Sequence, residues 1–505
     1  MMHQYDLVVV GTGAANTVTE MAAQAGLRVA LIEKGKFGGT CLTRGCIPTK
    51  VMVTAADKVR EAELWSTIGL VGTAPKMDWP VIARRVWEKI DESHDLKSHY
   101  QQLENVDVYE GTGSFTDNFT LEVKLHSGET VIVQGKKIVL GVGARSTIPN
   151  VVAESGVAYW SSENFFGEDF PQELPESLIV LGGGPIGTEF AHALATAGVK
   201  VTIIQHNRRL LPKEEPEISA WLAHQFEEFG VQVVLNQEIT RVFERADKKV
   251  VVVEDRETGE TAEVEAAALL VATGITPNSD LLHLENTDIH VDSRGYIVTN
   301  EFLETSVDGI YALGDINGQP PFRHKANYEA DIIGHNLWEV TEAKEYRWAR
   351  YSTVPVVTYT YPQVAHVGMT EEEARKSGRE VAIGTHYYSD TAKGFALGME
   401  KGSLHDGFIK LVVDATSQEV LGAHIVGPEA SILLQPFVNL LNAGATELEV
   451  IHPEIGSEEV QALRQQKPVR AMNPRLATTI SETMTPHPSL MEVPMWTRYY
   501  FEKKA

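Results

Sequence analysis

The chain has 505 residues, of which 43% are hydrophobic and 22% are charged, as in an ordinary globular protein of roughly three or four domains. Its formal net charge of -25 argues against non-specific nucleic-acid binding, because such binding needs a basic surface. The apolar runs are short and interrupted by glycine, so we expect no membrane span. Residues 1–6 lead into a predicted strand without a basic segment, and cysteine is scarce, which favours a cytoplasmic protein.

The first predicted elements form a βαβ unit. An apolar run over residues 5–10 predicts a buried parallel strand, and Gly11-Thr12-Gly13 follows it. A helix over residues 14–25 leads to a second strand, residues 29–32, which ends at Glu33. Glycines let a pyrophosphate approach the backbone, the helix N-terminus favours its charge, and Glu33 can accept hydrogen bonds from ribose hydroxyls. This pattern predicts a dinucleotide site.

The chain contains only two cysteines, Cys41 and Cys46, which lie five residues apart just after this unit. Two thiols this close in sequence can close a small disulfide ring and reopen it, which is a two-electron redox couple. In a chain with so few cysteines, such a pair indicates chemistry and not structural cross-linking. We therefore predict a redox-active disulfide.

A second strand, glycine loop, helix and strand begin at residue 177. The loop carries Gly182, Gly184 and Gly187, and the second strand ends at Gln205. An acidic residue at that place would repel a 2′-phosphate, whereas a neutral glutamine followed by His206, Arg208 and Arg209 does not. The pattern favours NADPH, or tolerance of both nicotinamides. The alternative is that the arginines are solvated loop charges.

Two dinucleotide sites and a dithiol together suggest an electron relay. A nicotinamide would supply hydride, a flavin would receive it, and the disulfide would accept the electrons. The flavin is expected because hydride does not pass efficiently from a nicotinamide directly to a protein disulfide.

With these features the sequence resembles the pyridine nucleotide–disulfide oxidoreductases, the flavin disulfide reductases, over nearly the whole chain. That family includes dihydrolipoyl dehydrogenase, glutathione reductase and mycothione reductase. The landmarks of the resemblance are residues 11–13, 41–50, 182–189, 272–274, 311–315 and 358–365. It implies an α/β fold with two Rossmann-like dinucleotide-binding domains, for FAD and NAD(P), and a C-terminal α+β dimerisation domain.

The resemblance also implies domain boundaries. The first segment of the FAD domain is expected at residues 1–150 and the NAD(P) domain at residues 151–274. The chain is expected to return to the FAD domain over residues 275–350. The dimerisation domain would take residues 351–505, with an insertion near residues 451–475 that rims the disulfide pocket, extends the dimer contact, or is only a tolerated surface loop.

Roles for individual residues follow from the same resemblance. Cys46 would lie against the flavin, Cys41 would attack the substrate disulfide, and Lys50 would sit near the flavin and pair with Glu189. The implied FAD contacts are Gly11, Gly13, Glu33, Gly39, Thr40, Lys50, Gly143 and Asp315. The implied NAD(P) contacts are Gly182, Gly184, Gly187, Gln205, His206, Arg208 and Gly274. No metal site is expected.

The family's acid–base histidine lies in a His-Pro step with a glutamate five residues later, and it enters the partner subunit's site. This chain has two His-Pro steps. His452 has Ser457 at the fifth position, whereas His487 has Glu492 there. We therefore predict His487 as the base and Glu492 as the carboxylate that orients it, in a homodimer where His487 completes the partner's site. His452 is expected in a loop or an interface near the surface.

The substrate stays open at this point. The sequence is compatible with a dihydrolipoyl dehydrogenase-like enzyme and with an NADPH-dependent reductase of a low-molecular-weight disulfide, as in mycothione or glutathione reductase. A third alternative is a non-catalytic flavin redox sensor or subunit. Arg44 between the cysteines could meet a carboxylate on a small disulfide, or could be a solvated or helix-capping arginine.

Overall fold

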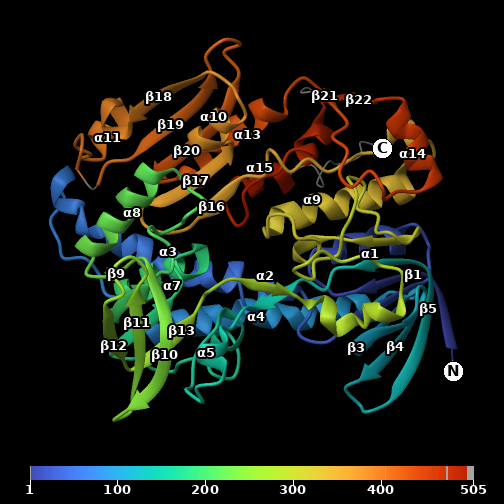
Figure 1. The fold of residues 1–505 in the computed structure, drawn as a ribbon, viewed down its shortest axis with the longest axis horizontal. Helices are drawn as coiled ribbons and strands as arrows, with labels where there is room; N and C mark the ends of the chain where they lie inside the picture. The colour runs from blue at the N-terminus through green and yellow to red at the C-terminus, as the bar shows by residue number, and fades with distance from the viewer. Residues whose placement is uncertain (1, 404, 474–475, 497–505) are drawn as a thin grey trace.

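The computed structural model describes residues 2–403, 405–473 and 476–496 (Figure 1). Its N-terminal part contains a mainly parallel β-sheet. Its strands pair in the order β3, β2, β1, β5, β15, and β4 bridges β3 and β5 in antiparallel fashion. Their bounds are β1 (Met2–Val10), β2 (Val29–Glu33), β3 (Val106–Asp117), β4 (Thr120–Leu125), β5 (Thr130–Leu140) and β15 (Ile310–Ala312). Because β15 arrives only after the second glycine-loop unit, this sheet is built from two separate stretches of the chain.

The first sheet is apolar on both faces. Leu7, Val9 and Leu31 are fully buried on the face that helices cover, and Val8 and Ile32 pack on the opposite face against β3, β4 and β5. Helix α1 (Ala15–Gln24) connects β1 to β2 and packs beside α9 (Arg323–Gly334), as Figure 1 shows. Strands buried on both faces read as continuous hydrophobic runs, which is the pattern that predicted them.

The second glycine-loop unit forms a smaller parallel sheet in the order β13, β7, β8, β9. Its bounds are β7 (Ser177–Leu181), β8 (Lys200–Ile204), β9 (Gln232–Val234) and β13 (Ala268–Val271), with helices α7 (Pro185–Thr196) and α8 (Pro216–Glu228). A three-stranded antiparallel sheet, β10 (Gln237–Arg245), β11 (Lys248–Asp255) and β12 (Thr261–Ala266), extends it. Among the described residues, no helix is both long and apolar enough to cross a lipid bilayer.

The C-terminal part is an antiparallel sheet in the order β16, β17, β20, β19, β18. Its strands are β16 (Val356–Thr358), β17 (Gln363–Gly368), β18 (Val381–Tyr387), β19 (Phe408–Asp414) and β20 (Val420–Gly427), with α10 (Glu371–Lys376), α12 (Ala430–Leu433) and α13 (Gln435–Asn442) beside them. The expected fold class, two Rossmann-like units and an α+β C-terminal domain, is confirmed.

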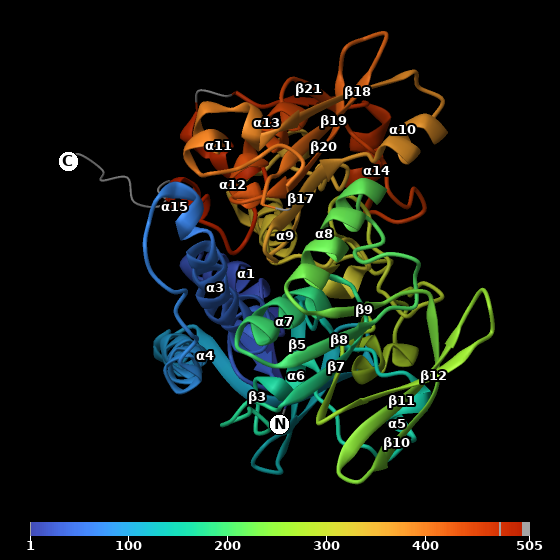
Figure 2. The ribbon, with the colours of Figure 1, turned by 90° about the vertical axis from the view of Figure 1, so that its left-hand side faces the viewer.

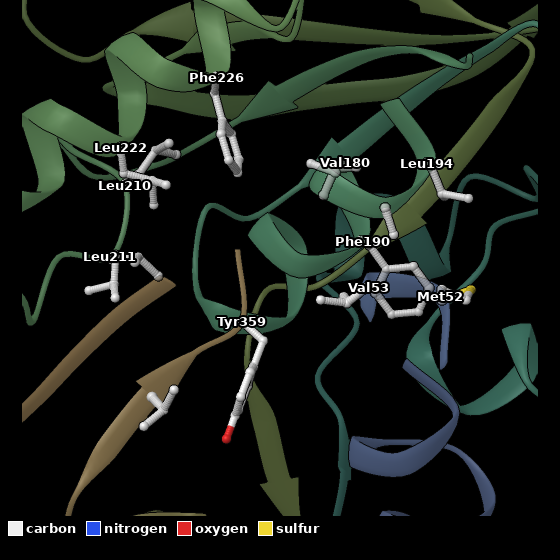
Figure 3. Close-up of a cluster of buried hydrophobic side chains, with 14 of the residues drawn as sticks. Met52, Val53, Val180, Phe190, Leu194, Leu210, Leu211, Leu222, Phe226 and Tyr359 are labelled. Carbon is white, nitrogen blue, oxygen red and sulfur yellow. The ribbon is translucent and has the colours of Figure 1, made fainter. Parts of the chain in front are cut away.

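One hydrophobic core runs through all three parts (Figure 3). Met52 and Val53 come from α3 (Cys46–Glu63), Phe190 comes from α7, and Tyr359 follows β16. Side chains this closely packed hold their neighbours in place, because protein interiors pack at about the density of organic crystals. The helix that carries Cys46 is therefore fixed against both the second sheet and the C-terminal sheet.

The predicted insertion near residues 451–475 is a folded element that packs against the segment expected at residues 275–350. Residues 474–475 lie outside the described part of the chain. Strand β22 (Val469–Ala471) pairs with β21 (Ala445–Glu447), and α14 (Glu458–Gln465) lies between them in sequence. Val460 and Leu463 of α14 pack against Phe302 and Trp348.

A buried ion pair fastens this element. The Arg464 guanidinium donates to both carboxylate oxygens of Glu301, from Nε at 2.8 Å and from the terminal nitrogen at 2.7 Å. The Glu301 side chain has no exposed surface and that of Arg464 is 7% exposed. Arg464 also donates to the carbonyls of Ile451, Pro453 and Ile455. A single side chain thus ties α14 and the carbonyls of residues 451–455 to Glu301.

Replacing Arg464 by alanine should detach this element, because it leaves the buried Glu301 carboxylate unpaired at a cost of about 3 to 5 kcal/mol. We expect a lower thermal midpoint and faster proteolytic cleavage within residues 451–473, measured by calorimetry and limited digestion. The matched control is Lys376→Ala, which removes an exposed pair with Glu372. Equal behaviour of the two variants would contradict the anchoring role.

Candidate active site

The two glycine loops open onto one cavity of about 1160 Å³ between the three parts of the fold. This volume exceeds the range of roughly 300–1,000 Å³ that is typical of a pocket for one small ligand. Gly11, Gly13, Gly182 and Gly184 all line it, and so do both cysteines. The cavity therefore has room for two dinucleotides that meet near the cysteine pair.

The first glycine loop fits the adenine-dinucleotide end of FAD. The carboxylate of Glu33 accepts from the Thr12 backbone N–H at 2.9 Å and from its hydroxyl at 2.6 Å, which fixes the loop against β2. Gly11 has φ +98°, and a Cβ there would collide with the Gly141 carbonyl. The other expected contacts, Gly39, Thr40, Gly143 and Asp315, also line the cavity.

Asp315 provides a further test of the fit to FAD. No described residue donates a hydrogen bond to its carboxylate, and burial raises its pKa above the usual range. An unpaired buried carboxyl is costly unless a ligand donates to it. A ligand rich in hydroxyl groups, such as the ribityl chain of a flavin, supplies such donors.

In the second glycine loop, a side chain again accepts a hydrogen bond from the loop backbone, but the residue is Gln205 and not a glutamate. The Gln205 side-chain oxygen accepts from the Gly183 N–H at 2.9 Å, and its amide donates to the Arg209 carbonyl at 3.3 Å. Gly187 does not line the cavity; it lies behind the loop, where a Cβ would collide with the Gly182 carbonyl. Gly274, at φ +121°, lines the cavity as expected.

The basic residues after Gln205 are partly engaged elsewhere. His206 lines the cavity and lies 3.1 Å from Glu238, whereas Arg208 does not line it and lies 3.4 Å from Glu257 on the surface. Exposed pairs of this kind are weak and exchange readily with other anions. Lys213 also lines the cavity, and the sequence analysis missed it because it lies outside the βαβ pattern.

The cysteines face each other across a break between two helices, α2 (Gly39–Thr43) and α3, at Arg44 and Gly45. Both are free thiols, and Cys46 is the first residue of α3, where a helix N-terminus favours a thiolate. A hydrogen bond from the Cys41 thiol, aided by the charges of His487 and Lys50, lowers the pKa of Cys46 to about 6 despite burial. Burial raises the pKa of Cys41.

His487 lies against the outer thiol. Its Nε2 is 3.1 Å from Cys41 Sγ, and its Nδ1 is 2.7 Å from a Glu492 carboxylate oxygen. Burial raises the pKa of Glu492, but the hydrogen bond and charge of His487 outweigh this effect and keep that pKa below its usual value. The three side chains form a line from carboxylate through imidazole to thiol, which is the geometry of a base that is oriented by a third group.

The source of this histidine differs from the expectation. The resemblance implied that His487 completes the partner subunit's site, whereas in the described chain it contacts Cys41 of the same chain. The His487 backbone N–H also donates to His324 Nδ1 of α9, at 3.4 Å, in the same chain. His452 lies exposed beside Glu454, in the surface position expected for it.

Lys50 and Glu189 form the buried pair expected from the sequence. Lys50 Nζ lies 2.6 Å from one Glu189 oxygen, and the Tyr359 backbone N–H donates to the other oxygen at 2.9 Å. The lysine also lies 4.5 Å from the centre of the Tyr359 ring. Tyr359 was not singled out from the sequence, because only the tertiary structure brings its strand to α3.

Two open questions from the sequence receive partial answers. None of the described residues from 451 to 473 lines the cavity, so the insertion does not rim the disulfide pocket in this chain. Arg44 does line the cavity, and its charge is near enough to Lys34 to add to the effect of burial in lowering that lysine's pKa. This places Arg44 toward the Glu33 end of the cavity and gives no support to a substrate-carboxylate contact.

Comparisons with known proteins agree with this geometry. Residues 5–330 match the family model described as pyridine nucleotide-disulphide oxidoreductase, and residues 354–462 match the dimerisation domain of the same family. The chain is 32% identical to dihydrolipoyl dehydrogenase from Zymomonas mobilis, over 89% of this chain and 94% of that protein. It is 33% identical to mycothione reductase from Mycobacterium tuberculosis, over 90% and 97%.

A solved structure covers the whole fold. The HOCl-induced flavoprotein disulfide reductase RclA from Escherichia coli aligns with a TM-score of 0.73 at 26% identity, over 99% of this chain and 100% of that one. The chain belongs to the pyridine nucleotide-disulphide oxidoreductase family of FAD-dependent enzymes that use NAD(P) as electron donor, with Cys41 and Cys46 as its redox-active pair.

Proposed function

We propose that this enzyme uses NADPH to reduce a small disulfide substrate through FAD and the Cys41–Cys46 pair. The observation that carries the proposal is the line Glu492–His487–Cys41 at the cavity wall, beside the acidic thiol of Cys46. A base held against one thiol is needed when the leaving group is itself a thiol that must be protonated. The related activity, oxidation of a dihydrolipoyl group with NAD, is the second candidate, because a dihydrolipoyl dehydrogenase is 32% identical.

FAD, when bound, supplies the two-electron link between the nicotinamide and the cysteine disulfide. Once the pair is reduced, Cys41 gives its proton to His487 Nε2 and attacks one sulfur of the substrate disulfide. A mixed disulfide forms, and His487 protonates the thiolate that leaves. The Cys46 thiolate then attacks Cys41 Sγ, which restores the Cys41–Cys46 bond and releases the second substrate thiolate to take up a proton. Glu492 keeps the imidazole in one orientation throughout.

Lys50 and Glu189 have an electrostatic role near the expected flavin site. Lys50 presents a positive charge to the cavity beside Cys46, and Glu189 holds it there. A fixed cation at this place favours negative charge on a reduced flavin and on the Cys46 thiolate. We assign Lys50 and Glu189 to this electrostatic role.

The matched dimerisation domain suggests a homodimer. We propose that each chain of that dimer uses its own His487, since the imidazole contacts Cys41 of the same chain. The chain has only these two cysteines, and such scarcity suits the reducing cytoplasm, where we place the enzyme.

Anaerobic reduction of the purified FAD-containing enzyme with NADPH tests the dithiol relay. Two-electron reduction should produce a long-wavelength absorption band, since a Cys46 thiolate would then lie beside oxidised flavin. The band should persist above pH 6 and fade below it, because the pKa of Cys46 is lowered to about 6 and protonation removes the thiolate. Cys46→Ser should lack the band, whereas Cys41→Ser should show it before any NADPH is added, because its Cys46 has no disulfide partner and lies beside oxidised flavin from the start. Direct bleaching of the wild-type flavin without the band would refute the relay.

The nicotinamide preference is tested by comparing kcat/KM for NADPH and NADH. The neutral Gln205 in place of an acid predicts a preference for NADPH. The variant Gln205→Glu keeps the tie to the Gly183 N–H and adds a negative charge, so kcat/KM for NADPH should fall about tenfold relative to NADH, which corresponds to about 1.4 kcal/mol. A strong NADH preference in the wild type would instead favour the dihydrolipoyl candidate.

Subunit complementation tests whether His487 acts within its own chain. Mixed dimers of Cys41→Ser and His487→Gln chains should be no more active than the two parents, since neither chain holds a complete site. Dimers of a wild-type chain with a Cys41→Ser/His487→Gln chain should keep about half of the wild-type activity per dimer. The wild-type chain then holds a complete site of its own. An exchanged histidine reverses both outcomes: the first mixture gains half the activity and the second loses it.

A further inference from the structure

A row of three basic side chains crosses the C-terminal sheet where it meets the NAD(P) domain. His366 of β17 lies directly opposite His424 of β20, and Lys410 of β19 lies opposite His424 from the other side. Residues directly opposite each other in antiparallel strands point to the same face of the sheet. The segment before α8 faces this row with Glu214 and Glu215, and Figure 2 shows α8 beside β17 and β20.

The lysine end of the row is a satisfied ion-pair cluster. Lys410 Nζ lies 2.9 Å from Glu215 and 2.9 Å from Glu371, and it also contacts Glu217. Every charge there has a partner, and no ligand is needed to explain it.

The histidine end is different, because one nitrogen has no partner. His424 is fully buried, and its Nε2 lies 2.9 Å from the Met369 carbonyl, so Nε2 must carry the proton of that hydrogen bond. Burial lowers the pKa of His424, which keeps the ring neutral and leaves Nδ1 as a bare lone pair. No described residue donates to that lone pair. A buried acceptor without a donor is costly and calls for a ligand.

Two further possible metal ligands lie close to His424. His366 Nδ1 is 2.8 Å from both oxygens of Glu214, and one ligand atom from each of Glu214, His366 and His424 lies within 4.8 Å of the other two. Two imidazoles and one carboxylate are a donor set that Zn²⁺ prefers. A histidine that donates its other ring N–H to a backbone carbonyl, as His424 does to Met369, has the usual second hydrogen bond of a metal ligand.

We propose that Glu214, His366 and His424 form a binding site for a divalent metal ion of the Zn²⁺ class, which joins the NAD(P) domain to the dimerisation sheet. Tetrahedral binding places ligand atoms about 3.3 Å from each other, so His366 and Glu214, now 2.8 Å apart, would open slightly on the ion. Glu214 and His366 line the central cavity, which gives the ion a path of entry. Three protein ligands leave a fourth position for water.

A second cluster could bind the same ion and must be kept separate. Cys41, Cys46 and His487 also have ligand atoms within 4.8 Å of one another, and thiolates bind Zn²⁺ tightly. The test therefore uses the oxidised, FAD-containing enzyme, in which the Cys41–Cys46 disulfide offers no thiolate.

Zinc chloride is titrated into the metal-free oxidised enzyme in the presence of a chromophoric chelator. We expect one Zn²⁺ per chain, with affinity at least about tenfold weaker in Glu214→Gln, His366→Gln and His424→Gln. The Cys41→Ser/Cys46→Ser variant should bind as the wild type does. So should His452→Gln, the matched control, which removes an exposed histidine paired with Glu454. Failure of the oxidised wild type to bind zinc, or binding that survives all three ligand variants, would overturn the proposal.

A measurement without variants guards against misfolding of the substituted chains. Co²⁺ added to the oxidised wild type should give weak visible bands of nitrogen and oxygen ligation. An intense sulfur-to-metal band in the near ultraviolet would assign the ion to the cysteines and would also overturn the proposal.

Discussion

The carboxylate of Glu189 joins all three parts of this enzyme. One oxygen holds Lys50 on the helix that carries Cys46, the other accepts from the Tyr359 backbone at the C-terminal sheet, and the residue itself belongs to the helix of the second glycine loop. A buried carboxylate with both oxygens engaged tolerates little displacement, because losing one partner leaves an unpaired charge. The relative position of the two cofactor sites and the thiols therefore depends on this group.

Around that carboxylate, the hydrophobic core and the electrostatics act together. Met52 and Val53 pack α3 between the other two parts (Figure 3), so the first turn of α3 presents Cys46 to the cavity in a fixed orientation. The helix N-terminus, Lys50 and the Cys41 thiol then all favour the Cys46 thiolate. Cys41, whose pKa burial raises, needs the separate base that His487 supplies. Two neighbouring cysteines thus obtain opposite acid–base properties from their surroundings.

The two glycine loops are held by the same kind of hydrogen bond, although they are expected to bind different cofactors. In each, a residue at the end of the second strand or directly after it accepts a hydrogen bond from the loop backbone: Glu33 in the first unit and Gln205 in the second. This hydrogen bond needs only an oxygen acceptor, so glutamine keeps the structure while removing a charge. A change between glutamate and glutamine at this position can therefore alter the cofactor preference without removing the hydrogen bond that holds the loop.

The sequence by itself determined the local units: both βαβ patterns, the cysteine pair and the His487–Glu492 spacing, because each depends on residues close together in the chain. The Lys50–Glu189 pair came from the resemblance, which carries long-range information that residue patterns lack. Only the tertiary structure brings His487 against Cys41 and Arg464 against Glu301, since both contacts join segments that share no local pattern. The same holds for Tyr359 and for the buried lone pair of His424, which exist as features only once strands and helices distant in sequence pack together.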